Sequence, residues 1–394
     1  MESILNGKER MIHAFCHKEA DMVPVGEAVI DSHVACKVLG KDAWVGGGGY
    51  IRKIRDYMIH DGNRNEFVDK YKEDTVEFFS KLDVDFMCAD LMPPINCNTR
   101  LESINEKRWR IIDDNLGIWS EYAYESKADY TTEIDSNFKQ YDGYGDVERY
   151  LEIFENDMKR PDKGIFDSIR YCKEKLGKEK FILTHFPQLY PHGSSWYTKF
   201  LMLMMEEPEL AKRLFDVYLK KALLYVEEYG KIGVDGLFIG GDWAGNSGPL
   251  YSPEMIKKYL VPQIRAVCDL AHEYNIKVIK HTDGNIMKIA DEFFGMGIDA
   301  YQSIDPFAGM ELKTVKELYG NKIVFFGNVD CGRTLVKGTR EEIIEEVKRC
   351  LLDGANGGGY VLTSSNTITK MIPADNYLIM LEAARKFGKL PLNL

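Results

Sequence analysis

The sequence predicts an α/β protein built as a (β/α)8 barrel, in which eight parallel strands form a closed ring and helices surround it. From about residue 164 onward, six short apolar strand patterns alternate with helical patterns across mostly short loops. Two further strand patterns nearer the N-terminus bring the number to eight. Polar side chains recur where the strands end, as in barrels that carry their chemistry at the C-terminal face.

The N-terminal part predicts a helical extension followed by two strand–helix steps. We expect a helix over 8–18, strands over 23–30 and 85–90, and a helix over 66–82. The glycines of 46–49 form either a lid or a plain linker. They are not a phosphate loop, because no Lys-Ser or Lys-Thr follows them.

An insertion is predicted over about 97–142. Apolar and polar residues alternate from Trp109 to Tyr124, and Asp114-Asn115-Leu116-Gly117 is a turn sequence. We therefore expect a β-hairpin near the C-terminal mouth of a single barrel domain spanning 1–394.

The remaining units follow one another without interruption. The predicted helices begin with 196–229, and Ser252-Pro253 marks another helix start, with Ser as N-cap and Pro in the first turn. The expected strands cover 181–186, 235–242, 277–281, 300–304, 323–328 and 359–363, and the later helices cover 286–296, 311–318, 340–353 and 374–387.

Polar residues at the strand ends give the candidate site. We expect His281, Asp242, Asp283 and Asp330 to meet in one cavity as catalytic groups. Substrate contacts are expected from Glu27, His185, Trp243, Asn328 and Asn366. Structural roles stay open for several of them: Asp330 as a cap, Cys331 as a buried thiol, and His185 and His281 as core histidines.

Composition excludes several classes of function. The net charge is −11, and no Lys/Arg cluster is interleaved with aromatic residues, so nucleic acid and anionic membranes are not expected partners. No apolar run approaches the roughly 20 residues of a membrane span. The eight cysteines form no Cys-x-x-Cys pair, and no signal peptide is recognisable. We expect a cytoplasmic protein with reduced thiols.

Several motifs resemble the uroporphyrinogen decarboxylase superfamily in order and spacing over about 164–390. They are Trp243-Ala244-Gly245, Ser252-Pro253-Glu254, Leu260-Val261-Pro262, His281-Thr282-Asp283-Gly284-Asn285, Gly327-Asn328-Val329-Asp330 and Pro373-x-x-Asn376. The resemblance implies a (β/α)8 barrel and one of two activities. The superfamily contains porphyrinogen decarboxylases and corrinoid-dependent methyltransferases.

The residues favour the methyltransferase branch. The decarboxylases hold a substrate with eight carboxylates through an arginine-rich first-strand motif. Residues 23–50 contain no arginine here and carry Glu27 and Asp31, and we expect no local basic pocket. A lyase acting on a small acid, or a barrel that has lost its activity, remains an alternative.

A metal site is also predicted near His281. The thiol-methylating members have a zinc site resembling His-x-Cys with a distant second Cys. Here the Cys position is Asp283, and Ser364-Ser365-Asn366 stands near the last one. His281 and Asp283 could bind zinc through nitrogen and oxygen, with Glu27, Asp242, Asp330 or Cys331 as the third ligand.

The cobalamin is expected on a separate corrinoid protein. The segment from Asp31 to Cys36 resembles the Asp-x-His-x-x-Gly motif of corrinoid carriers, but Cys36 replaces the glycine. Our hypothesis is methyl transfer from a small methylated compound to Co(I) of that partner. The expected aromatic rim favours a methoxylated aromatic over a quaternary amine and consists of Trp109, Trp119, Tyr190, Trp196, Tyr197 and Trp243. A homodimer stays open.

Overall fold

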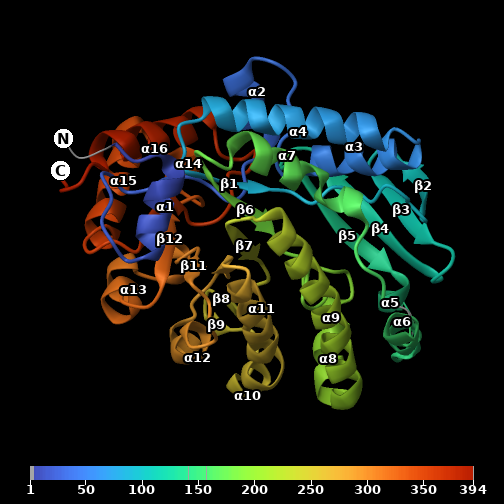
Figure 1. Cartoon of the computed structure of the whole chain (residues 1–394). Helices are drawn as coiled ribbons and strands as arrows, with labels where there is room; N and C mark the ends of the chain where they lie inside the picture. The colour runs from blue at the N-terminus through green and yellow to red at the C-terminus, as the bar shows by residue number, and fades with distance from the viewer. Residues whose placement is uncertain (1–3, 141, 157, 394) are drawn as a thin grey trace.

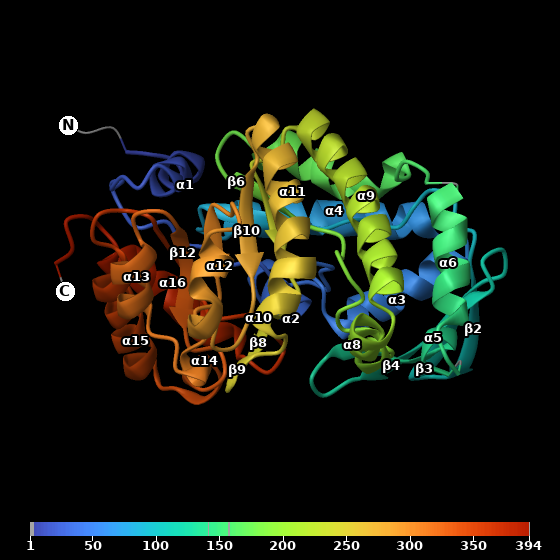
Figure 2. The same cartoon turned by 90° about the horizontal axis from the view of Figure 1, so that it is seen from below.

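The computed structural model describes residues 4–140, 142–156 and 158–393. It confirms the predicted barrel, because seven parallel strands lie in one curved sheet with helices around it (Figures 1 and 2). In sheet order the strands are β1 (Phe86–Ala89), β6 (Phe181–His185), β7 (Gly236–Ile239), β10 (Lys277–His281), β11 (Ala300–Gln302), β12 (Val324–Val329) and β13 (Tyr360–Ser364).

The eighth position of the ring is filled by an irregular segment, which corrects the continuous strand predicted over 23–30. Val25 forms an isolated parallel bridge with Leu362 of β13, and Ile30 forms another with Ile368. On the other side, Asp85 N donates to Val25 O at 2.7 Å, just before β1. Pro24 has no N–H to give to a ladder, so the segment closes the ring through single bridges.

The outer helices agree with the predicted alternation. The predicted helix over 196–229 is two helices, α8 and α9, because Pro208 begins a new helix in its first turn. Their bounds are α1 (Gly7–Phe15), α2 (Ser32–Leu39), α3 (Gly49–His60), α4 (Arg64–Lys81), α7 (Asp167–Leu176), α8 (Tyr197–Glu206), α9 (Pro208–Ile232), α11 (Val261–Glu273), α12 (Ala290–Phe294), α13 (Leu312–Tyr319), α15 (Arg340–Gly354) and α16 (Ala374–Phe387).

Local sequence explains where helices begin. Asn6 and Glu9 form a reciprocal capping box at α1, and Thr339 and Glu342 form one at α15. The predicted start at Ser252 is confirmed, since its side chain accepts a hydrogen bond from Met255 N at the beginning of α10 (Pro253–Met255).

The predicted insertion is larger than one hairpin. It is an antiparallel sheet of β2 (Arg100–Asn105), β3 (Arg108–Asp113), β4 (Ile118–Glu125) and β5 (Tyr130–Ser136), and the expected hairpin is the β3–β4 pair. The other two strands are mostly polar, so they lack the alternation that marked the hairpin. Helix α3 packs along this sheet, and the buried Trp109 donates to Asp56 of α3 at 3.1 Å (Figure 1).

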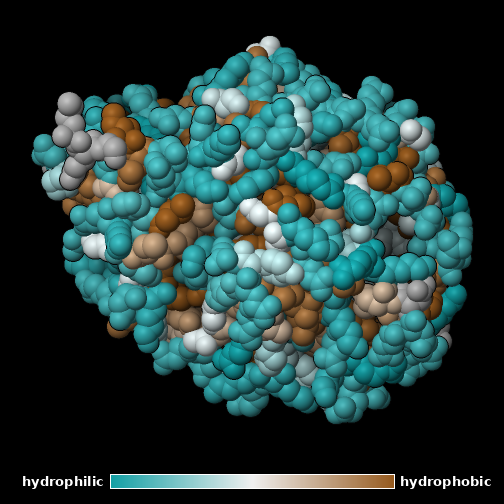
Figure 3. Space-filling view, in the orientation of Figure 1, coloured by the Kyte–Doolittle hydropathy of each residue, from teal (hydrophilic) through white to brown (hydrophobic). Residues whose placement is uncertain are grey.

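The face seen in Figure 3 is mainly hydrophilic, with apolar side chains in small separate patches. Within the described ranges, none of the helices combines the length and apolar character needed to cross a bilayer.

Candidate active site

Three predicted catalytic residues lie together at the C-terminal ends of neighbouring strands. His281 ends β10, Asp283 follows it, and Asp242 follows β7, which pairs with β10 in parallel. His281 Nε2 lies 3.6 Å from Asp242 Oδ1 and 3.7 Å from Asp283 Oδ1. One donor atom from each residue lies within 4.8 Å of the others, so this group, the mouth cluster, could share one cation or one proton.

Neighbouring polar groups fix the orientation of His281 and Asp283. His281 Nδ1 lies within hydrogen-bond reach of Gln302 Oε1 on β11. An amide oxygen only accepts, so with this assignment Nδ1 carries the proton and Nε2 faces the two carboxylates. Ser303 Oγ donates to Asp283 Oδ1 at 2.7 Å, and Asn366 donates to the other oxygen. Burial raises the pKa of Asp283, and the nearby His281 opposes that shift.

A buried lysine donates hydrogen bonds to the backbone next to the mouth cluster. Lys280 is fully buried, and its ammonium donates to Gly240 O at 3.0 Å, to Gly241 O at 2.7 Å and to His281 O. Burial lowers its pKa to about 7. These bonds join the loop before Asp242 to the end of β10. Sequence reasoning missed Lys280. The signal was a lysine inside the apolar run of a buried strand.

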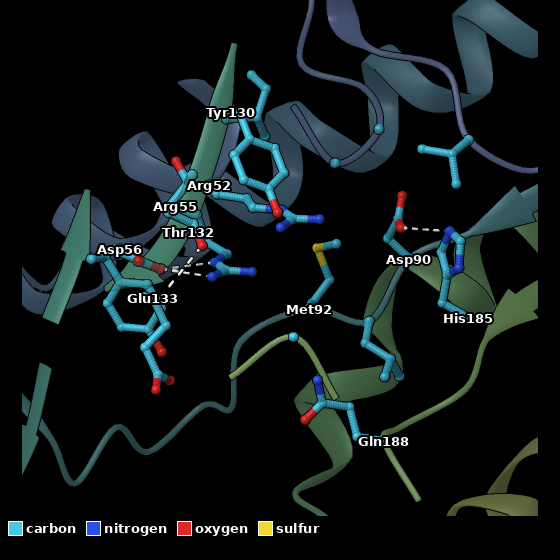
Figure 4. A pocket seen from close by; sticks show the side chains of 18 of the residues that line it. Arg52, Arg55, Asp56, Asp90, Met92, Tyr130, Thr132, Glu133, His185 and Gln188 are labelled. Atoms are coloured by element: carbon cyan, nitrogen blue, oxygen red, sulfur yellow. Dashed lines mark hydrogen bonds and ion pairs between the residues drawn. The ribbon is translucent and has the colours of Figure 1, made fainter. Parts of the chain in front are cut away.

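Two adjoining cavities open beside the cluster. The smaller, of about 350 Å³, is lined by His281, Gln302 and Asn366. The larger, of about 620 Å³, lies between the strand ends, α3 and the antiparallel insertion (Figure 4). The residues that line both cavities are Val29, Arg52, His185, Gln188 and His192.

His185 lies where the two cavities meet. Its Nε2 is 3.4 Å from Asp90 Oδ1 (Figure 4). Tyr71 donates to the other oxygen of Asp90. Burial lowers the pKa of His185, which favours the neutral ring. The residue is placed where it can contact a ligand.

Three predicted substrate contacts are placed elsewhere. Glu27 is buried at the ring closure, where its carboxyl oxygens accept from Ala28 N at 3.1 Å and Ser364 N at 2.9 Å. Asn328 donates to Ile304 O and accepts from Arg349 of α15, on the outer side of the sheet. Trp243 is buried against Phe293. None of Glu27, Asn328 and Trp243 lines either cavity.

Asp330 and Cys331 also lie outside the mouth cluster. Asp330 Oδ1 accepts from Gly332 N at 2.8 Å and Arg333 N at 2.9 Å, which is the capping role left open above. The Cys331 thiol is 3.2 Å from the Ser365 hydroxyl, and burial raises its pKa to about 11. A thiol with that pKa stays protonated near neutral pH.

The expected aromatic rim is wrong, because none of its six residues lines the cavities. Trp109, for example, is fully buried between the insertion and α3, while Tyr71, Tyr122 and Tyr130 line the larger cavity.

The expected absence of basic groups is also wrong. Arg52 and Arg55 of α3 line the larger cavity. Sequence reasoning missed them because α3 reaches the mouth only by packing on the insertion. Gly46, which precedes α3, has φ +72°, and a Cβ there would meet Ile30 O at 1.9 Å. The glycine segment 46–49 therefore packs closely against its neighbours, and Gly46 and Gly47 line the larger cavity.

The mouth cluster fits a metal through one imidazole nitrogen and two carboxylates. Three protein ligands with an open position are typical of catalytic zinc, and nitrogen and oxygen donors suit it. Of the four residues considered as a third ligand, Asp242 is the one that lies beside His281 and Asp283. Within the described ranges, no cysteine belongs to this group.

Residues 163–387 match the family model described as uroporphyrinogen decarboxylase (URO-D). The uroporphyrinogen decarboxylase of Actinobacillus succinogenes is 23% identical over 197 residues, covering 50% of this chain and 54% of that protein. The methylcobamide:CoM methyltransferase MtbA of Methanosarcina acetivorans is 26% identical over 231 residues, covering 57% of this chain and 63% of that protein. The matches thus span between about half and just under two thirds of these curated relatives.

Among solved structures, a methyltransferase from Methanosarcina mazei superposes with a TM-score of 0.61 at 18% identity. The superposition covers 97% of this chain and 99% of that one, so the fold is shared over nearly the whole length.

Proposed function

The chain belongs to the uroporphyrinogen decarboxylase family, and from that premise we propose that it is a corrinoid-dependent methyltransferase. It takes a methyl group from a small methylated compound, with a methoxylated aromatic as the first candidate, and passes it to Co(I) of a separate corrinoid protein. The similarity to MtbA and the methyltransferase fold support this branch.

The observation that carries the proposal is the mouth cluster beside a cavity of about 350 Å³, which is large enough for a small aromatic compound. A methyl group bound to oxygen leaves readily only if the departing oxygen is stabilised as negative charge develops on it. His281 lines the smaller cavity, and Asp242 and Asp283 lie close enough to His281 to help it hold a positive charge there. The strand-end position gives the substrate a rigid platform.

The chain's own groups account for orientation and proton supply. Gln302 keeps His281 Nδ1 occupied, so Nε2 is the atom that can present a proton or accept a metal. The C–O bond of the substrate breaks, its electron pair stays on oxygen, and a proton held by the cluster neutralises that oxygen. When bound at His281 Nε2, Asp242 and Asp283, a metal such as zinc would supply Lewis acidity to the leaving oxygen.

A porphyrinogen substrate fits the larger cavity poorly. The lining of that cavity combines Arg52 and Arg55 with the carboxyl groups of Asp56, Asp90 and Glu133. Three fixed carboxyl groups would oppose a substrate that carries eight more. This balance of charge favours methyl transfer over the lyase alternative.

The test is methylation of Co(I)-cobalamin by the purified chain with a methoxylated aromatic, followed by absorbance. His281→Ala should lower turnover by about 100-fold or more, since it removes a group acting on the leaving oxygen. Cys331→Ser is the matched control and should turn over normally, because Cys331 lies outside the cluster. Full activity of His281→Ala, or release of methyl groups without any cobalt acceptor, would reject the proposal.

A further inference from the structure

The larger cavity contains an arginine that forms no direct ion pair with the described residues, although its charge opposes the upward pKa shift of Asp31. Arg52 lies on α3 and lines both cavities. Within the described residues 4–140, 142–156 and 158–393, its guanidinium forms no hydrogen bond or ion pair. Figure 4 shows the guanidinium groups of Arg52 and Arg55 directed into the cavity from the same wall. A guanidinium with unused donors facing a cavity is suited to a planar anion.

Arg55 supplies a second, partly used guanidinium. Its Nε and Nη2 donate to Asp56 Oδ1 at 3.0 and 2.8 Å, which leaves Nη1 outside that pair. Trp109 donates to the other oxygen of Asp56 at 3.1 Å and so fixes the carboxylate that orients Arg55. The Arg55–Asp56 ion pair is therefore anchored by the insertion. Of the two arginines, Arg52 is the one whose guanidinium is available to a ligand.

The carboxyl groups of Asp90 and Glu133, which line the same cavity, already have donors. Asp90 accepts from Tyr71 and faces His185, while Glu133 accepts from Ser195 N at 3.0 Å and Ser195 Oγ at 2.6 Å. They do not compete for Arg52 at hydrogen-bond distance. Their charge nevertheless opposes a multiply charged ligand, so the site suits a single carboxylate better than a phosphate.

The position of Arg52 sets the direction of the ligand. Arg52 lies at the junction of the cavities, and His281 lines only the smaller one. The smaller cavity also carries Phe186 and Phe238, which offer apolar contact between the two ends. A ligand held by Arg52 can extend across these rings toward the mouth cluster.

We propose that Arg52 binds the carboxylate of the methyl donor, which makes the substrate a small methylated aromatic acid. The inference rests on the proposed function in taking the ligand to be the methyl donor. Arg55 and Asp56 position the wall from which Arg52 reaches the carboxylate. The opposite end of the acid carries the methoxyl group to His281.

Binding of simple probes tests the anion site without cobalt. Calorimetry should show 4-methoxybenzoate binding at least 10-fold more tightly than 4-methoxybenzamide, and more tightly than inorganic phosphate. Arg52→Met should weaken the acid at least 10-fold and leave the amide unchanged. Arg52→Lys keeps the charge without the two-pronged geometry and should fall between. Arg100→Met, an exposed arginine of β2 paired with Asp114, is the matched control and should bind as wild type.

The outcomes separate this inference from the proposed function. Equal binding of acid and amide, tighter binding of phosphate, or unchanged acid binding in both Arg52 variants would overturn it. If Arg52→Met does not fold, as judged by circular dichroism, Arg52→Lys alone decides between these results. Demethylation of the amide but not of the acid would reject the carboxylate site and leave methyl transfer standing. Tight, Arg52-dependent acid binding without methylation of cobalt would support the carboxylate site and reject methyl transfer to cobalt.

Discussion

Single side chains at the barrel mouth fall into groups that are proposed to act on the substrate and groups that position them. His281, Asp242 and Asp283 face one another beside the smaller cavity, while Gln302 orients the His281 ring and Lys280 bonds the backbone that carries the cluster. Lys280 is the unusual member, because a buried ammonium is costly unless its donors are satisfied. Its three backbone acceptors belong to the two loops that carry the cluster.

Lys280→Met should therefore damage the geometry of the cluster as well as stability. Three carbonyl groups would lose their donor, at a cost of roughly 1–3 kcal/mol per unsatisfied buried group. We expect turnover to fall at least 10-fold with a smaller change in KM, measured by the cobalt methylation assay. Lys316→Met is the control. Lys316 is partly buried on α13 and donates to Gly358 O, away from the mouth. If both variants lost turnover equally, Lys280 would have no positioning role.

Glu27 gives a pH dependence of stability. Burial raises its pKa from 4.5 to about 8, so the folded chain keeps a proton that the unfolded chain releases. Stability should then fall as the pH rises from about 4.5 to 8, by roughly 3 kcal/mol at pH 7, since one pKa unit is worth about 1.4 kcal/mol.

Urea unfolding at pH 5 and pH 7 measures this decline. Glu27→Gln cannot ionise and should lose this part of the pH dependence, although an amide nitrogen facing a backbone N–H should lower its stability at pH 5. Glu341→Gln, an exposed carboxylate in the first turn of α15, should keep the wild-type profile. The same decline in Glu27→Gln would show that Glu27 is ionised in the folded protein.

Among the elements, the antiparallel insertion contributes directly to the shape of the larger cavity. It forms one wall of the larger cavity and fixes α3 through Trp109, whose ring stacks on Tyr122 at 6.0 Å and meets Tyr57 edge-on at 6.0 Å. The insertion and α3 therefore position the arginines together.

Trp109→Ala should loosen this wall. Truncating a fully buried tryptophan costs about 3–5 kcal/mol, and here it also removes the donor to Asp56. We expect faster proteolysis within 100–136 and a higher KM for the methyl donor, with a smaller change in turnover of bound substrate. Trp119→Ala, whose ring is only partly buried beneath Arg110, is the control. Equal protease resistance in wild type and Trp109→Ala would mean that other contacts hold the sheet.

For the whole molecule, the open question is how the barrel meets its acceptor. The cavities open at the strand ends, and the structure provides a platform for chemistry there. Under the proposed function, a separate corrinoid protein approaches this mouth, accepts one methyl group and leaves, which suits a small and transient interface.

Methyl transfer should therefore stop after one equivalent of cobalt is methylated. With limiting Co(I)-corrinoid protein and excess methyl donor, the demethylated product should equal the cobalt present, measured by chromatography. Adding fresh Co(I) protein should restart the reaction. Demethylation that runs to completion without a corrinoid would show that a corrinoid protein is not the methyl acceptor.

The sequence by itself determined the barrel and three residues that lie together at its mouth. Alternating strand and helix patterns are local properties, so they predicted the parallel units, and residues that end paired parallel strands must meet at one face. Asp242, His281 and Asp283 were identified for that reason. Strand-end position alone was insufficient for Asn328, which turns outward to Arg349, and for Asp330, which caps the following turn.

Only the tertiary structure decided what surrounds that centre. Glu27 belongs to an irregular closure, because Pro24 cannot donate to a ladder, and the insertion is a four-stranded sheet whose polar strands carry no alternation signal. Arg52 and Arg55 reach the cavity through packing between α3 and this sheet, and both elements lie far in sequence from the strands that carry the mouth cluster. Such contacts depend on long-range packing and on which charges remain unpaired after folding, and neither property is local to a motif.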